Sequence, residues 1–142
     1  DGIDFGLTEI STFKQALEKK RSGINDNVVI YGEIANVRVG EDRENQTKWI
    51  RAEVEDVDGF RMPVKLEANL TDLFGQADWI DDYEEVAQNL YHMPVLLNGS
   101  PYIFETQTGT EKQAFVIKRG GWIADVTKLP KRVQDKIEKL LL

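Results

Sequence analysis

The sequence predicts a mainly β domain of five strands, with a helical insert between the third and fourth strands and one helix at each end. Residues 28–66 alternate apolar and polar side chains between turn signals, which is typical of half-buried strands. Residues 69–90 change to helical spacing, and residues 94–126 return to strand-like runs. We therefore expect one domain over residues 1–142, with an N-terminal helical extension over 1–27, the strand region over 28–126 and a C-terminal helix over 127–142.

The bulk composition is that of a globular protein. Hydrophobic residues make up 41% of the chain and charged residues 30%, which separates it from disordered and membrane-spanning sequences. No apolar run approaches the roughly 18 residues of a membrane-spanning helix, residues 1–10 lack a signal-peptide pattern, and there is no cysteine. We expect a cytoplasmic protein with no membrane association, no disulfide and no thiolate metal site.

The net charge of −7 is concentrated in one segment. Residues 67–90, the acidic insert, contain seven acidic and no basic side chains. The charge of this insert therefore equals the net charge of the whole chain. The rest of the chain is neutral overall, which leaves room for a local basic face. The acidity of the whole chain therefore does not exclude an anionic partner.

The first part of the chain supplies a helix and the first strand. A Ser or Thr cap, apolar residues at helical spacing and a stop at Gly23 predict a short helix over about 11–21. Residues 28–39 are rich in β-branched side chains. Gly32 within them predicts a bulge or sharp bend, which a strand serving two sides of a small barrel requires. The apolar-free stretch 41–47 is a loop.

A hairpin joins the second and third strands. Residues 49–55 alternate between apolar and polar side chains, which predicts one buried and one exposed face. Asp58-Gly59 predicts a two-residue loop, because both residue types tolerate positive φ. Pro63 cannot donate to a strand ladder, so we expect a strand edge or a bulge at that position.

The second half adds helices and two strands. Residues 69–90 predict one or two helices broken near Gly75, and residues 94–107 and 112–126 predict strands four and five. Pro130 opens a final helix with an apolar stripe. The stripe consists of Val133, Ile137, Leu140 and Leu141. It either folds back onto its own domain, which we favour, or associates with another copy or subunit.

The opening strands resemble those of OB-fold nucleic-acid-binding domains, the modules of bacterial replicative polymerase subunits and single-stranded DNA-binding proteins. The resemblance lies in VVIYGEIANVRVG (28–40) followed by WIRAEVEDVDGFRMPVKL (49–66), and in the strand and helix order up to residue 126. It implies a five-stranded Greek-key barrel with a helix between strands three and four. It also implies non-catalytic binding of single-stranded nucleic acid.

The resemblance and the residue chemistry together indicate a binding face. In OB domains this face is formed by strands two and three and by the loops joining strands one to two and four to five. An aromatic ring there stacks a base for about 1–3 kcal/mol, and neighbouring cations contact phosphates. The candidate residues are Arg38, Trp49, Arg51, Arg61, Lys65, Tyr102, Phe104 and Lys112.

Each candidate also has a structural alternative. Trp49 could close one end of the barrel, and Arg51 and Arg61 could form ion pairs with the glutamates of the second strand. The two aromatics of the fourth strand more often pack in a core. A basic loop residue is more often simply solvated.

The pattern of ionisable residues does not indicate catalysis. The acidic residues between Asp78 and Glu85 would share a helical face, but a solvated face is favoured over a magnesium site. His92 is the sole histidine and has no nucleophile arranged near it in the sequence. We therefore expect no enzymatic activity, no cofactor and no metal.

Two functional hypotheses remain. The first is binding of single-stranded nucleic acid with low sequence specificity, in replication or repair; DNA is favoured as the ligand, and RNA stays open. The alternative is a protein-interaction or assembly module that uses the acidic insert and the C-terminal helix, either as a homo-oligomer or within a larger replication or repair protein.

Overall fold

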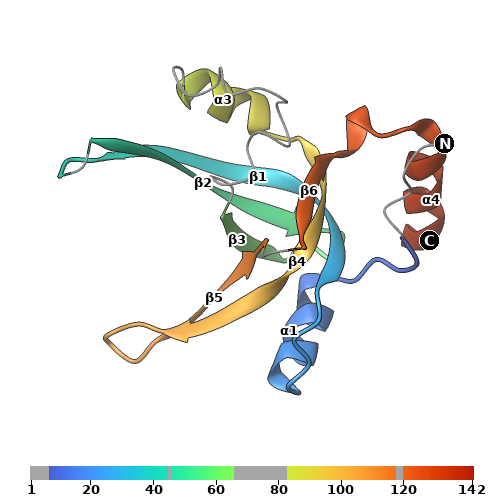
Figure 1. Ribbon diagram of the computed structural model, residues 1–142, viewed down its shortest axis with the longest axis horizontal. Coiled ribbons are helices and arrows are strands. Elements are labelled where there is room, and N and C mark those ends of the chain that lie inside the picture. The colour runs from blue at the N-terminus through green and yellow to red at the C-terminus, as the bar shows by residue number, and fades with distance from the viewer. Residues whose placement is uncertain (1–6, 45, 66–82, 118–119) are drawn as a thin grey trace.

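A computed structural model describes residues 7–44, 46–65, 83–117 and 120–142. It confirms a mainly β architecture, with strands of one sheet surrounded by helices (Figure 1). The elements in chain order are α1 (Phe13–Arg21), β1 (Val28–Asp42), β2 (Thr47–Asp56), β3 (Arg61–Lys65), α3 (Tyr83–Leu90), β4 (Pro94–Glu105), β5 (Glu111–Val116), β6 (Trp122–Asp125), the short 3-10 helix η3 (Val126–Lys128) and α4 (Lys131–Leu141).

The sheet closes on itself. Its pairings run in the order β1-β2-β3-β5-β4 and return from β4 to β1, so five strands form a ring. All these pairs are antiparallel except β3 and β5, which meet in parallel at Val64 and Phe115. β6 pairs with the first part of β4, outside the ring.

β1 serves two sides of the ring, as the sequence predicted. Its first half pairs with β4 and its second half with β2. The predicted bulge does not lie at Gly32, where a Cβ would lie 2.6 Å from the Glu55 carbonyl oxygen and 2.6 Å from Val54 Cγ1. Gly32 therefore allows β2 to approach closely. The irregularity in the ladder lies further along, between Ile34 and Asn36.

Residues 57–59 form the loop between Asp56 and Phe60, the last hydrogen-bonded pair of the β2–β3 hairpin, so the predicted two-residue loop is wrong. Asp56 N–H donates to the Phe60 carbonyl, and Gly59 N–H donates to the Asp56 carbonyl, both at 3.0 Å. Gly59 has φ 82°, whereas Asp58 is not among the described residues with positive φ. A turn followed by one left-handed glycine therefore closes the hairpin.

The last predicted strand is divided in two. The sequence indicated one strand over 112–126, but the structure has β5 and β6 with a turn at Gly120, whose φ is 85°. Because β5 pairs with the end of β4 and β6 with its beginning, the turn lets the chain follow β4 along most of its length.

The interior of the ring is apolar, and two helices cover it. The inward-facing side chains include Ile30, Ile34, Ile50, Val54, Met62, Val64, Leu97 and Phe115. On α1, Phe13 packs edge-on against Phe115 with ring centroids 5.5 Å apart. On α3, Val86 and Leu90 are buried in the same cluster. The two helices lie on opposite sides of the ring (Figure 1).

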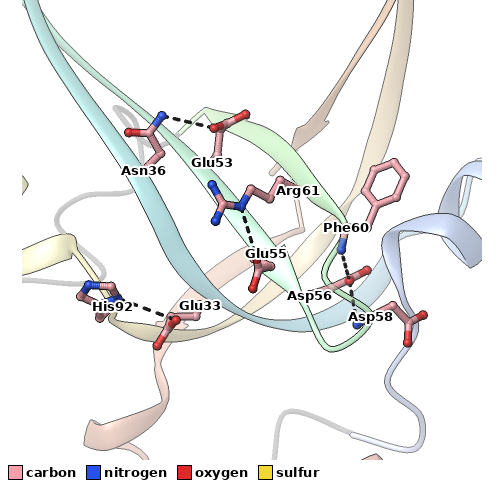
Figure 2. Close-up of polar contacts among 9 residues, drawn as sticks. All are labelled: Glu33, Asn36, Glu53, Glu55, Asp56, Asp58, Phe60, Arg61 and His92. Atoms are coloured by element: carbon pink, nitrogen blue, oxygen red, sulfur yellow. Dashed lines mark hydrogen bonds and ion pairs between the residues drawn. The ribbon is translucent and has the colours of Figure 1, made fainter.

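One buried carboxylate joins the β2–β3 loop to α1. Asp56 is 4% exposed, and its Oδ2 accepts the N–H of Phe13, the first residue of α1, at 2.9 Å. Its Oδ1 accepts the N–H groups of Asp58 and Phe60, each at 3.0 Å (Figure 2). The first N–H groups of a helix have no partner within it. A single side chain therefore orders both the loop and the start of the helix.

A second apolar cluster lies outside the ring, under α4. Val133 and Ile137 are buried there together with Leu96 of β4 and Val126 of η3. The two leucines that complete the stripe are partly buried in the same cluster. The favoured prediction, that the C-terminal stripe folds back onto its own domain, is confirmed.

Part of the predicted insert lies outside the described residues. This applies to the proposed helix break near Gly75 and to all acidic side chains before Glu84. The described part of the insert is α3, whose residues Glu84 and Glu85 are exposed. Among the described residues, no helix is long and apolar enough to cross a membrane.

Candidate functional site

Two hairpins extend from the ring toward the same side and diverge from one another (Figure 1). One consists of β1 and β2, and the other of β4 and β5. They are joined at their base by β3 and β5, which meet at Val64 and Phe115. The outward-facing side chains of the two hairpins border the candidate site.

Three cations form a row across β1, β2 and β3. The strand register places Arg38 opposite Arg51, and Arg51 opposite Lys65. Directly opposed side chains lie about 5 Å apart at Cβ, where like charges destabilise a sheet. All three are exposed, and none forms an ion pair with another residue in the described part of the chain. In an acidic protein, such an uncompensated row is the arrangement expected of an anion-binding surface.

Trp49 supports this row. It is half-buried and lies against Gly40, the residue opposite it on β1, where a Cβ would collide with the indole ring. The guanidinium carbon of Arg51 lies 4.6 Å from the centre of that ring, a cation–π contact. Trp49 thus faces outward, not into a barrel end, and one face of its ring holds Arg51.

Tyr102 and Phe104 provide exposed aromatic surface on β4. Their side chains are 51% and 37% exposed, and the rings stack with centroids 5.5 Å apart and planes at 21°. They lie opposite Ala114 and Lys112 on β5. The expectation that core packing would bury these aromatics is therefore wrong for both. Exposed π surface of this kind suits a planar ligand.

A groove of about 700 Å³ separates the aromatic pair from the cations. Arg51, Pro63 and Lys65 line it on the side of β2 and β3, and Tyr102 and Phe104 line it on the side of β4. The remaining lining residues are Ala52, Val64, Glu105, Ala114 and Val116. The groove brings together residues from two distant parts of the sequence, 51–65 and 102–116.

A smaller hollow of about 230 Å³ opens beside the groove. The two share Arg51, Ala52 and Pro63. The other lining residues of the hollow are Asn36, Arg38 and Glu53. Asn36 Nδ2 donates to Glu53 Oε1 at 3.3 Å, a contact that bridges β1 and β2 (Figure 2). Cationic and acidic side chains are therefore both presented inside the hollow.

The two remaining candidates lie at different distances from the groove. Lys112 is exposed opposite Phe104, next to the groove. Arg61 is engaged elsewhere, because its Nε donates to Glu55 Oε1 at 2.9 Å (Figure 2). This hydrogen bond, reinforced by the charge of Glu55, raises the pKa of Arg61 above its ordinary value. For Arg61, the structural alternative from the sequence is the arrangement observed.

An ion pair connects α1 to the β4–β5 hairpin near its loop. Arg21, at the end of α1, donates to the carboxylate of Glu111, the first residue of β5. The hydrogen bond from Arg21, and then its charge, lower the pKa of Glu111 below its ordinary value. Both side chains are exposed, so the pair orients the hairpin more than it stabilises the fold.

The described residues do not provide a metal site. Within them, no group of three or more His, Cys, Asp or Glu side chains could hold an ion. His92 Nδ1 lies 3.8 Å from Glu33 Oε2, and both side chains are largely exposed. The acidic residues for which a solvated face was favoured over a magnesium site lie mainly outside the described residues.

Sequence reasoning missed Asn36 and Glu53. Glu53 was seen only as a partner for an arginine, and Asn36 was read as part of an apolar strand. Their contact depends on the irregularity between Ile34 and Asn36, which sets the β1–β2 register beyond it. No local pattern specifies that shift. A polar residue inside an apolar strand, such as Asn36, is the one signal that pointed to it.

The comparisons with known proteins leave the site to be interpreted by its geometry. No protein-family model matches the chain, and no curated protein matches it. The strand ring, the cation row, the aromatic pair and the two hollows are therefore the observations from which a function is inferred.

Proposed function

We propose that this protein is an OB-type domain that binds single-stranded nucleic acid, in the first place DNA, without catalysing a reaction. The fold supports this proposal. A closed ring of five strands with a helix between β3 and β4 agrees with what is expected of an OB-type domain. Domains of this class act in replication and repair, and we propose the same setting here.

The observation that carries the proposal is the pairing of two surfaces across one groove. Arg38, Arg51 and Lys65 form a row of like charges at a cost to the sheet. Facing them, Tyr102 and Phe104 expose stacked rings to water. A polymer with phosphates along one side and aromatic bases along the other would neutralise the row of like charges and cover the exposed rings.

The binding mechanism follows from this arrangement. The phosphates of the strand lie along the cation row, with Lys112 contributing beside Phe104. One or two bases stack on the Tyr102–Phe104 pair. The apolar side chains of Ala114 and Val116 line the groove between the two surfaces. A duplex would not suit this groove, because its bases are already stacked and their faces are not available.

The alternative of an assembly module is less favoured by the described residues. The apolar stripe of α4, which such a module would use, is already buried against Leu96 and Val126. The acidic residues of α3 belong to a different surface from the groove. We therefore pursue nucleic-acid binding as the proposal.

The test is a fluorescence anisotropy titration with a labelled oligo-dT of about 12 nucleotides, a length within the range that one OB domain covers. We expect binding at low salt. With four phosphate contacts, from the cation row and Lys112, log K should fall against log salt with a slope of about −3, since single strands give about −0.7 per contact. Tyr102→Ala should weaken binding about 5- to 150-fold, the equivalent of one lost base stack.

Three controls make the result specific. Arg51→Gln should weaken binding and flatten the salt slope, whereas Arg132→Gln, an exposed arginine on α4, should change neither. Tyr102→Leu keeps apolar bulk without an aromatic face and should behave like Tyr102→Ala. Poly-glutamate, an anion without bases, should not compete. Absence of binding at low salt, or binding unaffected by Tyr102→Ala and Arg51→Gln together, would overturn the proposal.

A further inference from the structure

The smaller hollow beside the groove has a polar lining that a purely sequence-independent binder does not need. Its cations, Arg38 and Arg51, belong to one row across the strands, and its acid, Glu53, belongs to the next row. Hydrogen-bond donors therefore occupy one end of the hollow, and an acceptor occupies the other. Pro63, opposite Glu53 on β3, adds an apolar wall.

The hollow is of suitable size for one base. Its volume of about 230 Å³ is below the 300–1,000 Å³ typical of drug-sized ligand pockets. It lies directly beside the groove, because the two share the lining residues Arg51, Ala52 and Pro63. A strand held in the groove can therefore place one base in the hollow without leaving the cation row.

Glu53 is fixed in position at this site. Asn36 Nδ2 donates to its Oε1 at 3.3 Å, and Asn36 itself accepts from the Tyr91 hydroxyl at 3.5 Å. Among the described residues, Glu53 takes part in no ion pair within 4.0 Å. Its second carboxylate oxygen is therefore left as an acceptor in a hollow that Arg38 and Arg51 also line.

We propose that this hollow reads one base of the bound strand and selects cytosine over thymine. This inference rests on the proposed function. Cytosine has acceptors, O2 and N3, at one end of its edge and a donor, the N4 amine, at the other. The acceptors match Arg38 and Arg51, and the amine matches Glu53, since carboxylates accept from cytosine N4.

Thymine does not match the hollow in the same orientation. It places a carbonyl oxygen, O4, where cytosine has its amine. Two acceptors would then face one another, and a carboxylate without a donor would be desolvated. The two bases have the same ring size and stack similarly. A difference in affinity between oligo-dC and oligo-dT therefore reports the hydrogen bonds made to the base.

The experiment compares oligo-dC with oligo-dT of equal length in the same anisotropy titration at neutral pH. The wild-type protein should bind oligo-dC about tenfold more tightly, in line with one good base contact. Glu53→Gln keeps the size of the side chain but can donate to thymine O4, so the preference should fall to near unity.

Glu55→Gln is the matched control. Glu55 lies on the same strand, its removal changes the net charge equally, and it does not line the hollow. This variant should keep the tenfold preference. Melting curves for both variants check that the fold is intact.

The outcomes separate this inference from the proposed function. Equal binding of the two oligonucleotides by the wild type overturns the inference and leaves the proposed function standing. Binding of neither overturns both. If Glu53→Gln strengthens both oligonucleotides equally and the preference persists, Glu53 acts only through its charge, and the inference is wrong.

Discussion

Two outward-facing surfaces of this sheet arise from the same alternation of side chains, but one is covered by α4 and the other is exposed to solvent. Near β6, the outward residues are apolar: Val29, Tyr31, Leu96 and Trp122 lie in the cluster that α4 covers. On the two diverging hairpins, the outward residues are Arg38, Arg51, Lys65, Tyr102 and Phe104. They are exposed, in some cases at a cost to stability.

The comparison shows which surface stabilises the fold and which is available for a ligand. Covered apolar side chains contribute free energy of folding through burial. An exposed row of like charges and an exposed aromatic pair contribute little or nothing. Substitutions on the covered surface should therefore change stability without changing binding, and substitutions on the open surface should do the reverse.

The largest expected effect is on the covered surface. Ile137, 3% exposed on α4, should lose about 2–5 kcal/mol of unfolding free energy when replaced by alanine, because its methyl groups leave a cavity. Urea denaturation measures this loss. Oligo-dT affinity of the folded fraction should not change. A variant that binds more weakly while fully folded would show that the two surfaces are coupled.

Asp56 tests whether the fold can be weakened away from both surfaces. Asp56→Ala removes the acceptor of three backbone N–H groups, two in the β2–β3 loop and one at the start of α1. We expect a loss of roughly 2–4 kcal/mol by chemical denaturation. Asp56→Asn should lose less, because its oxygen can still serve the loop. Equal losses for the two variants would contradict this division of roles.

A smaller effect of opposite sign is expected on the open surface. Arg51→Gln relieves repulsion from Arg38 and Lys65, so stability should rise by about 0.2–1 kcal/mol while affinity for oligo-dT falls. Thermal melting at low and high salt measures the gain, which should shrink as salt screens the charges. A stability loss would mean that the contact with Trp49 outweighs the repulsion.

The smallest effect concerns pH. Because the pKa of Glu111 is lowered in the folded state by Arg21, this pair stabilises the fold above the unfolded pKa of about 4.3. That contribution is lost as pH falls through the lower folded value. Arg21→Gln should therefore narrow the difference in melting temperature between neutral and acidic pH slightly. An unchanged difference would show that the exposed pair contributes nothing measurable.

Much of the fold was predictable, because the alternation of apolar and polar residues along β2 and β3 indicates which side chains face inward. Alternation does not state whether the other face will be covered. For Tyr102 and Phe104, core packing was therefore favoured over ligand binding, although the structure exposes both side chains. Nor does it give register beyond an irregularity, so the alignment of Arg38 with Arg51 emerged only from the structure.

The contact between β3 and β5 gives the groove a mechanical meaning. Within the described residues, these strands are joined at one paired position, Val64 with Phe115, whereas each other junction of the ring has five or more. With the fewest paired positions, the β3–β5 junction is the one expected to separate first when force is applied to the ring. The groove crosses this junction, since Lys65 of β3 lines one side of the groove and Val116 of β5 lines the other. A nucleic-acid strand bound in the groove would contact both sides of the β3–β5 junction. Binding would therefore stabilise this junction against separation of the two strands.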